Sequence, residues 1–89
     1  MSDKKADSAA IQDWCMAFVA KILHVSRDRI DPNVEVDRLG LDSSTAVALI
    51  MSLEEHLGIE LMPELLFEYP TISGLSKHLA SRVAAEGGA

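Results

Sequence analysis

Two adjacent serines near the middle of this 89-residue chain are its best candidates for chemistry. They end the run Leu39-Gly40-Leu41-Asp42-Ser43-Ser44. An aspartate followed by serine is typical of a helix N-cap, and capping alone would account for the pair. A serine at that place also exposes its hydroxyl beside unpaired backbone N–H groups, which favour an attached phosphate ester. The residues therefore leave two interpretations of Ser43 open: a capping position or an attachment site.

The other reactive side chains form no recognisable catalytic or metal site. Ser43 does not lie in the Gly-x-Ser-x-Gly pattern of a nucleophile turn. His24, His56 and His78 fall in separate segments without a shared ligand spacing, so we expect structural roles for them. Cys15 is the single cysteine and lies in an apolar stripe, as expected of a small core residue. We expect no metal and no enzyme activity.

Apolar stripes with helical spacing predict the elements that position the serines. A first helix is expected after Ser8, a candidate N-cap, and a second from Asp42 or Ser43 to about Leu57, where Gly58 suits the left-handed position after a helix. The first stripe contains Ile11, Trp14, Cys15, Phe18, Val19, Ile22 and Leu23. The second contains Ala46, Leu49, Ile50, Leu53 and Leu57. Both repeat at i, i+3, i+4 and i+7, which indicates one buried face per helix.

The rest of the chain is predicted to complete the bundle. Pro63 can open a short helix over residues 64–68, and Thr71 can cap a last helix. That helix has the stripe Ile72, Leu75, Leu79 and Val83. Residues 24–41 lack helical periodicity, and a connection this long usually has a function. Its apolar residues indicate that it packs across the bundle: Ile30, Val34, Val36 and Leu39.

These elements predict an all-α fold, a four-helix bundle with three main helices, one short helix and a long first loop. Hydrophobic residues make up 48% of the chain and aromatics only 4%, which suits an aliphatic helical core. We expect one domain over residues 8–85, with disordered tails at 1–7 and 86–89.

The charge distribution excludes some partners and favours others. The net charge is −6, and between Asp31 and Pro70 nine acids stand against one base, Arg38. Nucleic acid binding needs clustered cations, so it is not expected. An acidic surface would steer proteins with basic patches, although it would also simply keep a small domain soluble. The chain start lacks a signal-peptide core, and no apolar run could span a membrane, so we expect a cytoplasmic monomer.

Two segments together resemble a known family. Leu39-Gly40-Leu41-Asp42-Ser43 is similar to the phosphopantetheine attachment signature of acyl carrier proteins. The segment from Leu65 to Ile72, with Leu75 and His78-Leu79-Ala80, looks like the C-terminal signature of polyketide-synthase carrier domains. The resemblance covers roughly residues 10–82, with both signatures on the expected elements.

The resemblance implies a role for each of these residues. Ser43 would carry 4′-phosphopantetheine, transferred from coenzyme A by a phosphopantetheinyl transferase with Mg²⁺. The terminal thiol of that arm would hold acyl intermediates as thioesters for polyketide or lipid biosynthesis. Asp42 would cap the helix and help to position the transferase. Loading and elongation would come from partners: an acyltransferase or acyl-adenylate ligase, and a ketosynthase or other synthase enzymes.

The second helix is the family's recognition helix, and it departs from the family pattern in two places. The expected docking residues are Ser44, Val47, Ala48, Met51, Glu54, Glu55 and Glu64. An apolar centre with a charged rim suits a docking face, although core packing and solvation explain the same residues. Ser44 stands where the family usually has leucine, and Ala48 where many fatty-acid carriers have an acid. Both differences indicate a dedicated set of partners.

Two rival functions remain open. A peptidyl carrier of a nonribosomal peptide synthetase would share the fold and the serine. A helical interaction adaptor without a prosthetic group would share only the acidic surface, and it would not need Ser43.

Overall fold

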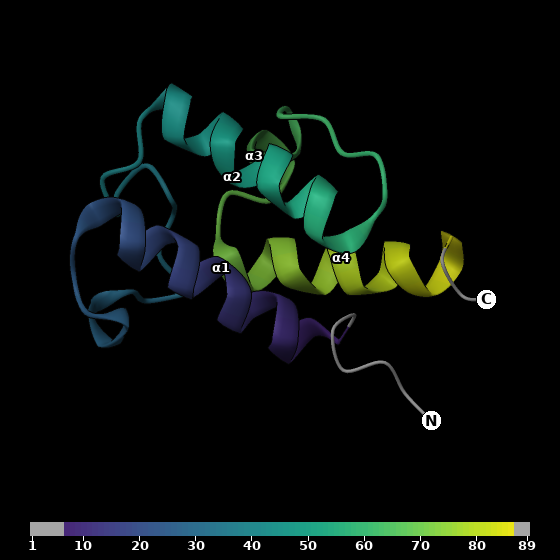
Figure 1. Ribbon diagram of the computed structural model, residues 1–89, viewed down its shortest axis with the longest axis horizontal. Coiled ribbons are helices and arrows are strands. Elements are labelled where there is room, and N and C mark those ends of the chain that lie inside the picture. Colours follow the sequence, from purple (N-terminus) through teal and green to yellow (C-terminus); the bar gives the residue numbers. More distant parts are fainter. Residues whose placement is uncertain (1–6, 87–89) are drawn as a thin grey trace.

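The computed structural model describes residues 7–86 and confirms the all-α bundle. Its elements are α1 (Ser8–Leu23), the 3-10 turn η2 (Arg27–Arg29), α2 (Ser43–Leu57), α3 (Leu65–Glu68) and α4 (Ile72–Glu86). Figure 1 shows α1 lying across α4, with α2 along the other side of the core and the long first loop closing one end. No helix in these residues is long and apolar enough to cross a bilayer.

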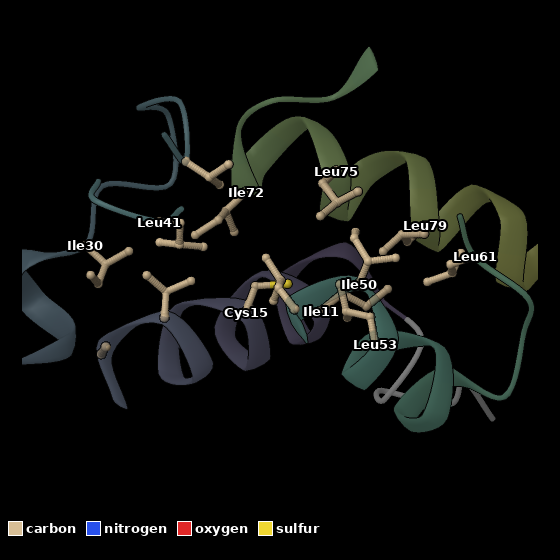
Figure 2. Close-up of a cluster of buried hydrophobic side chains, with 14 residues drawn as sticks. Ile11, Cys15, Ile30, Leu41, Ile50, Leu53, Leu61, Ile72, Leu75 and Leu79 are labelled. Atoms are coloured by element: carbon tan, nitrogen blue, oxygen red, sulfur yellow. The ribbon is translucent and has the colours of Figure 1, made fainter. Parts of the chain in front are cut away.

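The core is aliphatic and forms between the three long helices, as their sequence stripes predict. Figure 2 shows its side chains converging from α1, α2, α4 and the first loop. Nine residues from the predicted stripes are completely buried: Ile11, Cys15, Val19, Leu49, Ile50, Leu53, Ile72, Leu75 and Leu79. The aromatic members of the first stripe, Trp14 and Phe18, are only partly buried and stack on each other at its edge.

Both ends of α2 and the start of α4 lie at the predicted capping residues, whereas the start of α1 does not. Asp42 caps α2, and Gly58 ends it with φ 71°. The backbone N–H of Gly74 donates to Thr71 Oγ1 at 3.1 Å, which caps α4. The predicted N-cap of α1, Ser8, is instead its first helical residue, because the helix is entered at Asp7 and the Ile11 N–H bonds to the Asp7 carbonyl.

Two smaller boundaries differ by about one residue. The short helix α3 begins at Leu65 rather than at residue 64, after turn bonds from Leu66 to Pro63 and from Phe67 to Glu64. Helix α4 includes Glu86, the first residue of the predicted C-terminal tail. Asp7, the last residue of the predicted N-terminal tail, is the N-cap of α1. The remaining predicted tail residues, 1–6 and 87–89, lie outside the described residues.

The long first loop is held to the start of α4 by backbone hydrogen bonds. The Val36 N–H donates to the Pro70 carbonyl and the Ser73 N–H donates to the Pro32 carbonyl, each at 2.8 Å. Glu35 and Thr71 form an isolated antiparallel bridge at the same place. Three residues of the loop, Ile30, Val36 and Leu41, are buried in the core. The loop therefore packs across the bundle as predicted, and it places the residues that precede α2.

One polar group inside the core was not expected from the sequence. Ser76 is fully buried and its hydroxyl donates to the Ile72 carbonyl at 2.7 Å, one turn back in α4. Its neighbour across the α1–α4 contact is the buried Cys15. Burial raises the pKa of the Cys15 thiol to about 12, although a hydrogen bond with Ser76 opposes this. The thiolate is therefore disfavoured, and Cys15 is an inert core residue.

The buried stripe of α2 leads to a stability prediction. Leu53 is completely buried, so Leu53→Ala removes buried apolar surface and leaves a cavity. We expect it to lower the free energy of unfolding by about 2–5 kcal/mol, measured by urea denaturation. Met51→Ala on the same helix is the control, because Met51 is 57% exposed. Equal effects of the two changes would contradict this assignment of helix faces.

Candidate functional site

Ser43 is the first residue of α2, and its side chain is exposed. It follows Asp42, whose Oδ1 accepts hydrogen bonds from the Thr45 backbone N–H at 2.9 Å and from the Thr45 hydroxyl at 3.0 Å. The first turn of α2 is thus fixed by its own cap. The Ser43 hydroxyl lies at the positive end of the helix dipole and is open to a partner.

The carboxylate of Asp42 is held in its ionised form by these bonds. The hydrogen bond from the Thr45 backbone N–H is the main cause that lowers the pKa of Asp42, followed by the Thr45 side chain; desolvation opposes them, and the Ser44 backbone adds a smaller lowering effect. Asp42 is exposed. The sequence prediction that this residue caps α2 is confirmed.

Gly40 forms a turn in the backbone just before this cap. Its φ of 106° lies in the region that favours glycine. A Cβ at this position would lie 3.6 Å from Leu23, an ordinary contact. The glycine therefore matters for backbone conformation, which lets the loop turn into Leu41 and Asp42.

An open groove of about 750 Å³ lies beside Ser43. The end of the first loop, the start of α2 and the segment through α3 form its walls. Its lining residues are Glu35, Val36, Asp37, Leu41, Asp42, Ser43, Ala46, Val47, Pro63, Glu64, Leu66, Phe67 and Pro70. The walls are mostly apolar and the acids lie among them, so the groove suits a neutral, partly apolar chain attached at Ser43.

The predicted docking residues divide between two faces of α2. Ser44, Ala48, Met51 and Glu55 are spaced i, i+4, i+7 and i+11, so they share a stripe of the helix. Three of them are exposed, and Ala48 is partly buried. Val47 is one turn after Ser43 and lines the groove with it. The exposed stripe and the groove are therefore adjacent but distinct.

The two predicted glutamates nearest α3 have different surroundings. Glu54 is partly buried, and its Oε2 accepts a hydrogen bond from the Leu61 N–H at 3.1 Å, which fixes the connection between α2 and α3. Glu64 is exposed and lines the groove. Glu54 thus has a structural bond that the sequence did not reveal, whereas Glu64 presents its charge at the mouth of the site.

Two exposed apolar residues near the site were missed by the sequence analysis. Phe67 is 87% exposed and lines the groove from α3, and Met62 is 59% exposed just before it. The segment 59–70 contains only one helical turn, so it has no periodicity from which exposure could be predicted. Large exposed apolar side chains beside a groove are typical of a binding surface.

The three histidines have separate surroundings, and two of them stack on aromatic rings. His56 stacks on Trp14 with ring centroids 4.8 Å apart, and His78 stacks on Tyr69 at 4.3 Å. His24 ends α1 in the left-handed conformation with φ 57°. Across residues 7–86, no three His, Cys, Asp or Glu side chains gather as a metal site would require.

A family comparison matches residues 13–79 to the phosphopantetheine attachment site. This segment includes α2, the groove residues and the Asp42–Ser43 pair. The chain belongs to the phosphopantetheine-binding carrier family. Its prosthetic group is therefore 4′-phosphopantetheine.

Its relatives include carrier segments of polyketide synthases. The carrier is 42% identical over 62 residues to the spectinabilin polyketide synthase system protein NorC of Streptomyces orinoci, which covers 70% of this chain. It is 34% identical over 74 residues, or 83% of the chain, to polyketide synthase PksM of Bacillus subtilis. The chain spans only 3% and 2% of the lengths of these two relatives.

Solved carrier structures have the same fold. A free-standing peptidyl carrier protein from Acinetobacter baumannii matches with a TM-score of 0.83 and 36% identity, covering 88% of this chain and 98% of the other. The acyl carrier protein Asl1650 from Anabaena sp. PCC 7120, described as having a variant phosphopantetheinylation-site sequence, matches at 0.82 and 39%, covering 92% and 93%.

The residues at the start of α2 fit the prosthetic group of the family. A phosphate ester on Ser43 would lie at a helix N-terminus, where backbone N–H groups and the dipole favour an anion. The groove next to it could receive the arm that follows the phosphate. When bound, phosphopantetheine supplies a thiol that carries acyl groups as thioesters.

The cap of α2 gives a prediction about pH. Because the folded pKa of Asp42 is lowered, its contribution to stability is present above the unfolded pKa and is lost as pH falls through the folded value. Asp42→Asn keeps a good N-cap without the titrating charge. We expect the urea midpoint of the wild type to fall more than that of the variant between about pH 6 and about pH 3.

NMR measurements on the same two proteins test whether Asp42 causes this difference in acid sensitivity. NMR titration should place the wild-type Asp42 pKa below that of an unstructured aspartate. Parallel loss of stability in both proteins over this range would contradict the prediction, since the remaining carboxylates are shared.

Proposed function

We propose that this carrier attaches phosphopantetheine at Ser43 and works as an acyl carrier in polyketide or lipid assembly. The chain itself would supply the arm, its mobility and a surface for recognition, while partner enzymes make and break the bonds. The observation that carries this proposal is the exposed serine at the start of α2, on the wall of an apolar groove and within the matched family segment.

Ser43 is favoured over Ser44 for two reasons. It directly follows Asp42, as the attachment signature requires, and its side chain lines the groove. Ser44 is also exposed but lies on the stripe of α2 that contains Met51 and Glu55. The two hydroxyls are therefore separated by about one-quarter turn of the helix, and the groove lies beside Ser43.

An acyl cargo is favoured by the polyketide synthase relatives, with a peptidyl carrier as the second candidate. The second candidate has support from the peptidyl carrier of Acinetobacter baumannii, which is 36% identical. Both kinds of carrier receive a carboxylic acid on the arm, so the enzyme that activates this acid distinguishes them. We infer loading by an acyl-adenylate ligase or acyltransferase. If an amino-acid adenylating enzyme loads the protein faster than an acyl-adenylate ligase or acyltransferase does, the peptidyl alternative is favoured.

Recognition is proposed to use the exposed stripe of α2 together with the residues at the groove mouth. Met51 gives an apolar centre, and Glu55 and Glu64 give an acidic rim. An apolar centre with charged surroundings suits a partner with a basic rim, because such charges speed encounter and fix orientation. Phe67 extends the apolar part of this surface toward α3.

The attachment site can be tested by incubation with coenzyme A, Mg²⁺ and a broad-specificity phosphopantetheinyl transferase. We expect the wild type and Ser44→Ala to gain one phosphopantetheine by intact-protein mass spectrometry, and Ser43→Ala to gain none. The change removes only an exposed hydroxyl, so circular dichroism should show an unchanged fold.

A thiol reagent gives an independent readout of the same reaction. Because Cys15 is the single cysteine and is buried, the native apo-protein should show no reactive thiol and the modified protein one. No mass gain in a well-folded wild type would overturn the proposal and favour a helical adaptor. A gain retained in Ser43→Ala and lost in Ser44→Ala would move the site to Ser44.

The docking face can be tested with the same transferase. Met51→Asp places a charge at the proposed apolar centre, and it should lower kcat/KM for phosphopantetheine transfer about fivefold or more, as for a contact worth over 1 kcal/mol. Val25→Asp is the matched control, because Val25 is also an exposed hydrophobic residue but follows α1. Equal rates for both variants would count against docking on α2.

A further inference from the structure

The first turn of α2 contains a contact that ordinary capping does not require. Asp42 already caps the helix by accepting from the Thr45 N–H at 2.9 Å. The Thr45 hydroxyl is a second donor to the same residue: it lies 3.1 Å from the Asp42 carbonyl oxygen and 3.0 Å from Asp42 Oδ1. Both the main chain and the side chain of Asp42 are thus tied to Thr45.

The other helices show that this arrangement is particular to α2. At α4 the hydroxyl of the cap residue Thr71 simply accepts from the Gly74 N–H. At α1 the cap residue Asp7 makes no side-chain cap bond. Only at α2, among the described helices, does the side chain three residues inside the helix bond back to the cap residue.

This contact acts on the peptide that places Ser43. Asp42 and Ser43 share one peptide group, and that group follows the glycine-dependent turn at Gly40. The hydroxyl of Thr45 has one proton, so it donates to one of the two Asp42 oxygens at a time and keeps the other within reach. The β-branched Thr45 side chain has few rotamers, so its hydroxyl stays close to Asp42 and links α2 to the end of the loop.

We propose that Thr45 is a positioning residue for the modification of Ser43, which holds the Asp42–Ser43 peptide in place while the serine hydroxyl reacts. This inference depends on the proposed attachment at Ser43. In that transfer the bond between Ser43 Oγ and phosphorus forms, the bond from phosphorus to the nucleotide part of coenzyme A breaks, and the serine proton goes to a base of the transferase. Thr45 touches none of the reacting atoms and acts through Asp42.

The physical reason is the sensitivity of group transfer to geometry. A reacting hydroxyl must be held close to its productive position, and supporting hydrogen bonds limit its motion. Asp42 and Ser43 are exposed, so Asp42 is held by hydrogen bonds from the first turn of α2: the Thr45 N–H donates to its carboxylate and the Ala46 N–H to its carbonyl, each at 2.9 Å. The Thr45 hydroxyl is the side-chain group that supplies this support from within α2.

The test uses Thr45→Val, which keeps the shape and the backbone cap bond but removes the hydroxyl. We expect kcat for phosphopantetheine transfer to fall roughly two- to tenfold, as for the loss of one net hydrogen bond, while KM stays the same because the docking stripe is intact. Thr45→Ser should restore most of kcat. Intact-protein mass spectrometry over time measures the rates.

Thr71→Val is the matched control for a general loss of stability. It removes the threonine cap of α4, so it should lower the melting temperature without slowing the transfer. Unchanged kcat in Thr45→Val, with wild type still loaded at Ser43, would overturn the positioning role. So would a loss shared equally with Thr71→Val, or no rescue by Thr45→Ser. Failure to load the wild type at Ser43 would instead overturn the proposed function.

Discussion

The attachment between the first loop and the start of α4 is the constraint on which the site depends. The bonds from Val36 to Pro70 and from Ser73 to Pro32 join segments that are over 30 residues apart in sequence. They set where the loop ends, and therefore where α2 begins and where one wall of the groove stands. Without them the core stripes could still pack, but the end of the first loop, which forms one wall of the groove beside Ser43, would lose its attachment to the start of α4.

Most of the fold could be predicted because its helices are specified locally. The apolar stripes identify residues such as Leu49 and Leu53 as core residues, and Gly58 fixes the end of α2 through its own backbone conformation. The partner of the first loop could not be predicted, because backbone hydrogen bonds between distant segments have no side-chain pattern in the sequence. The N-cap of α1 was predicted one residue too late, at Ser8. Its true N-cap, Asp7, makes no side-chain capping bond, so its position depends on the backbone alone.

The candidate site was predictable in its centre and less so at its edges. Asp42 caps α2 and the exposed Ser43 follows it, as predicted, because an N-cap is specified by residues within one helical turn. Glu54 read as part of an acidic rim, yet its carboxylate bonds to the Leu61 N–H, a contact that depends on how the chain turns after α2. Phe67 was missed because a four-residue helix has too few turns to show which side faces water.

The division of α2 into two faces explains how one short helix could serve an arm and a partner together. Ser43 and Val47 line the groove, while Ser44, Met51 and Glu55 lie on the adjacent stripe of the helix, outside the groove lining. A chain lying in the groove would leave the exposed stripe open, so a partner could bind before the cargo moves. The buried stripe of the same helix, with Leu53 fully enclosed, keeps both faces at fixed angles, because rotation of α2 would expose the core.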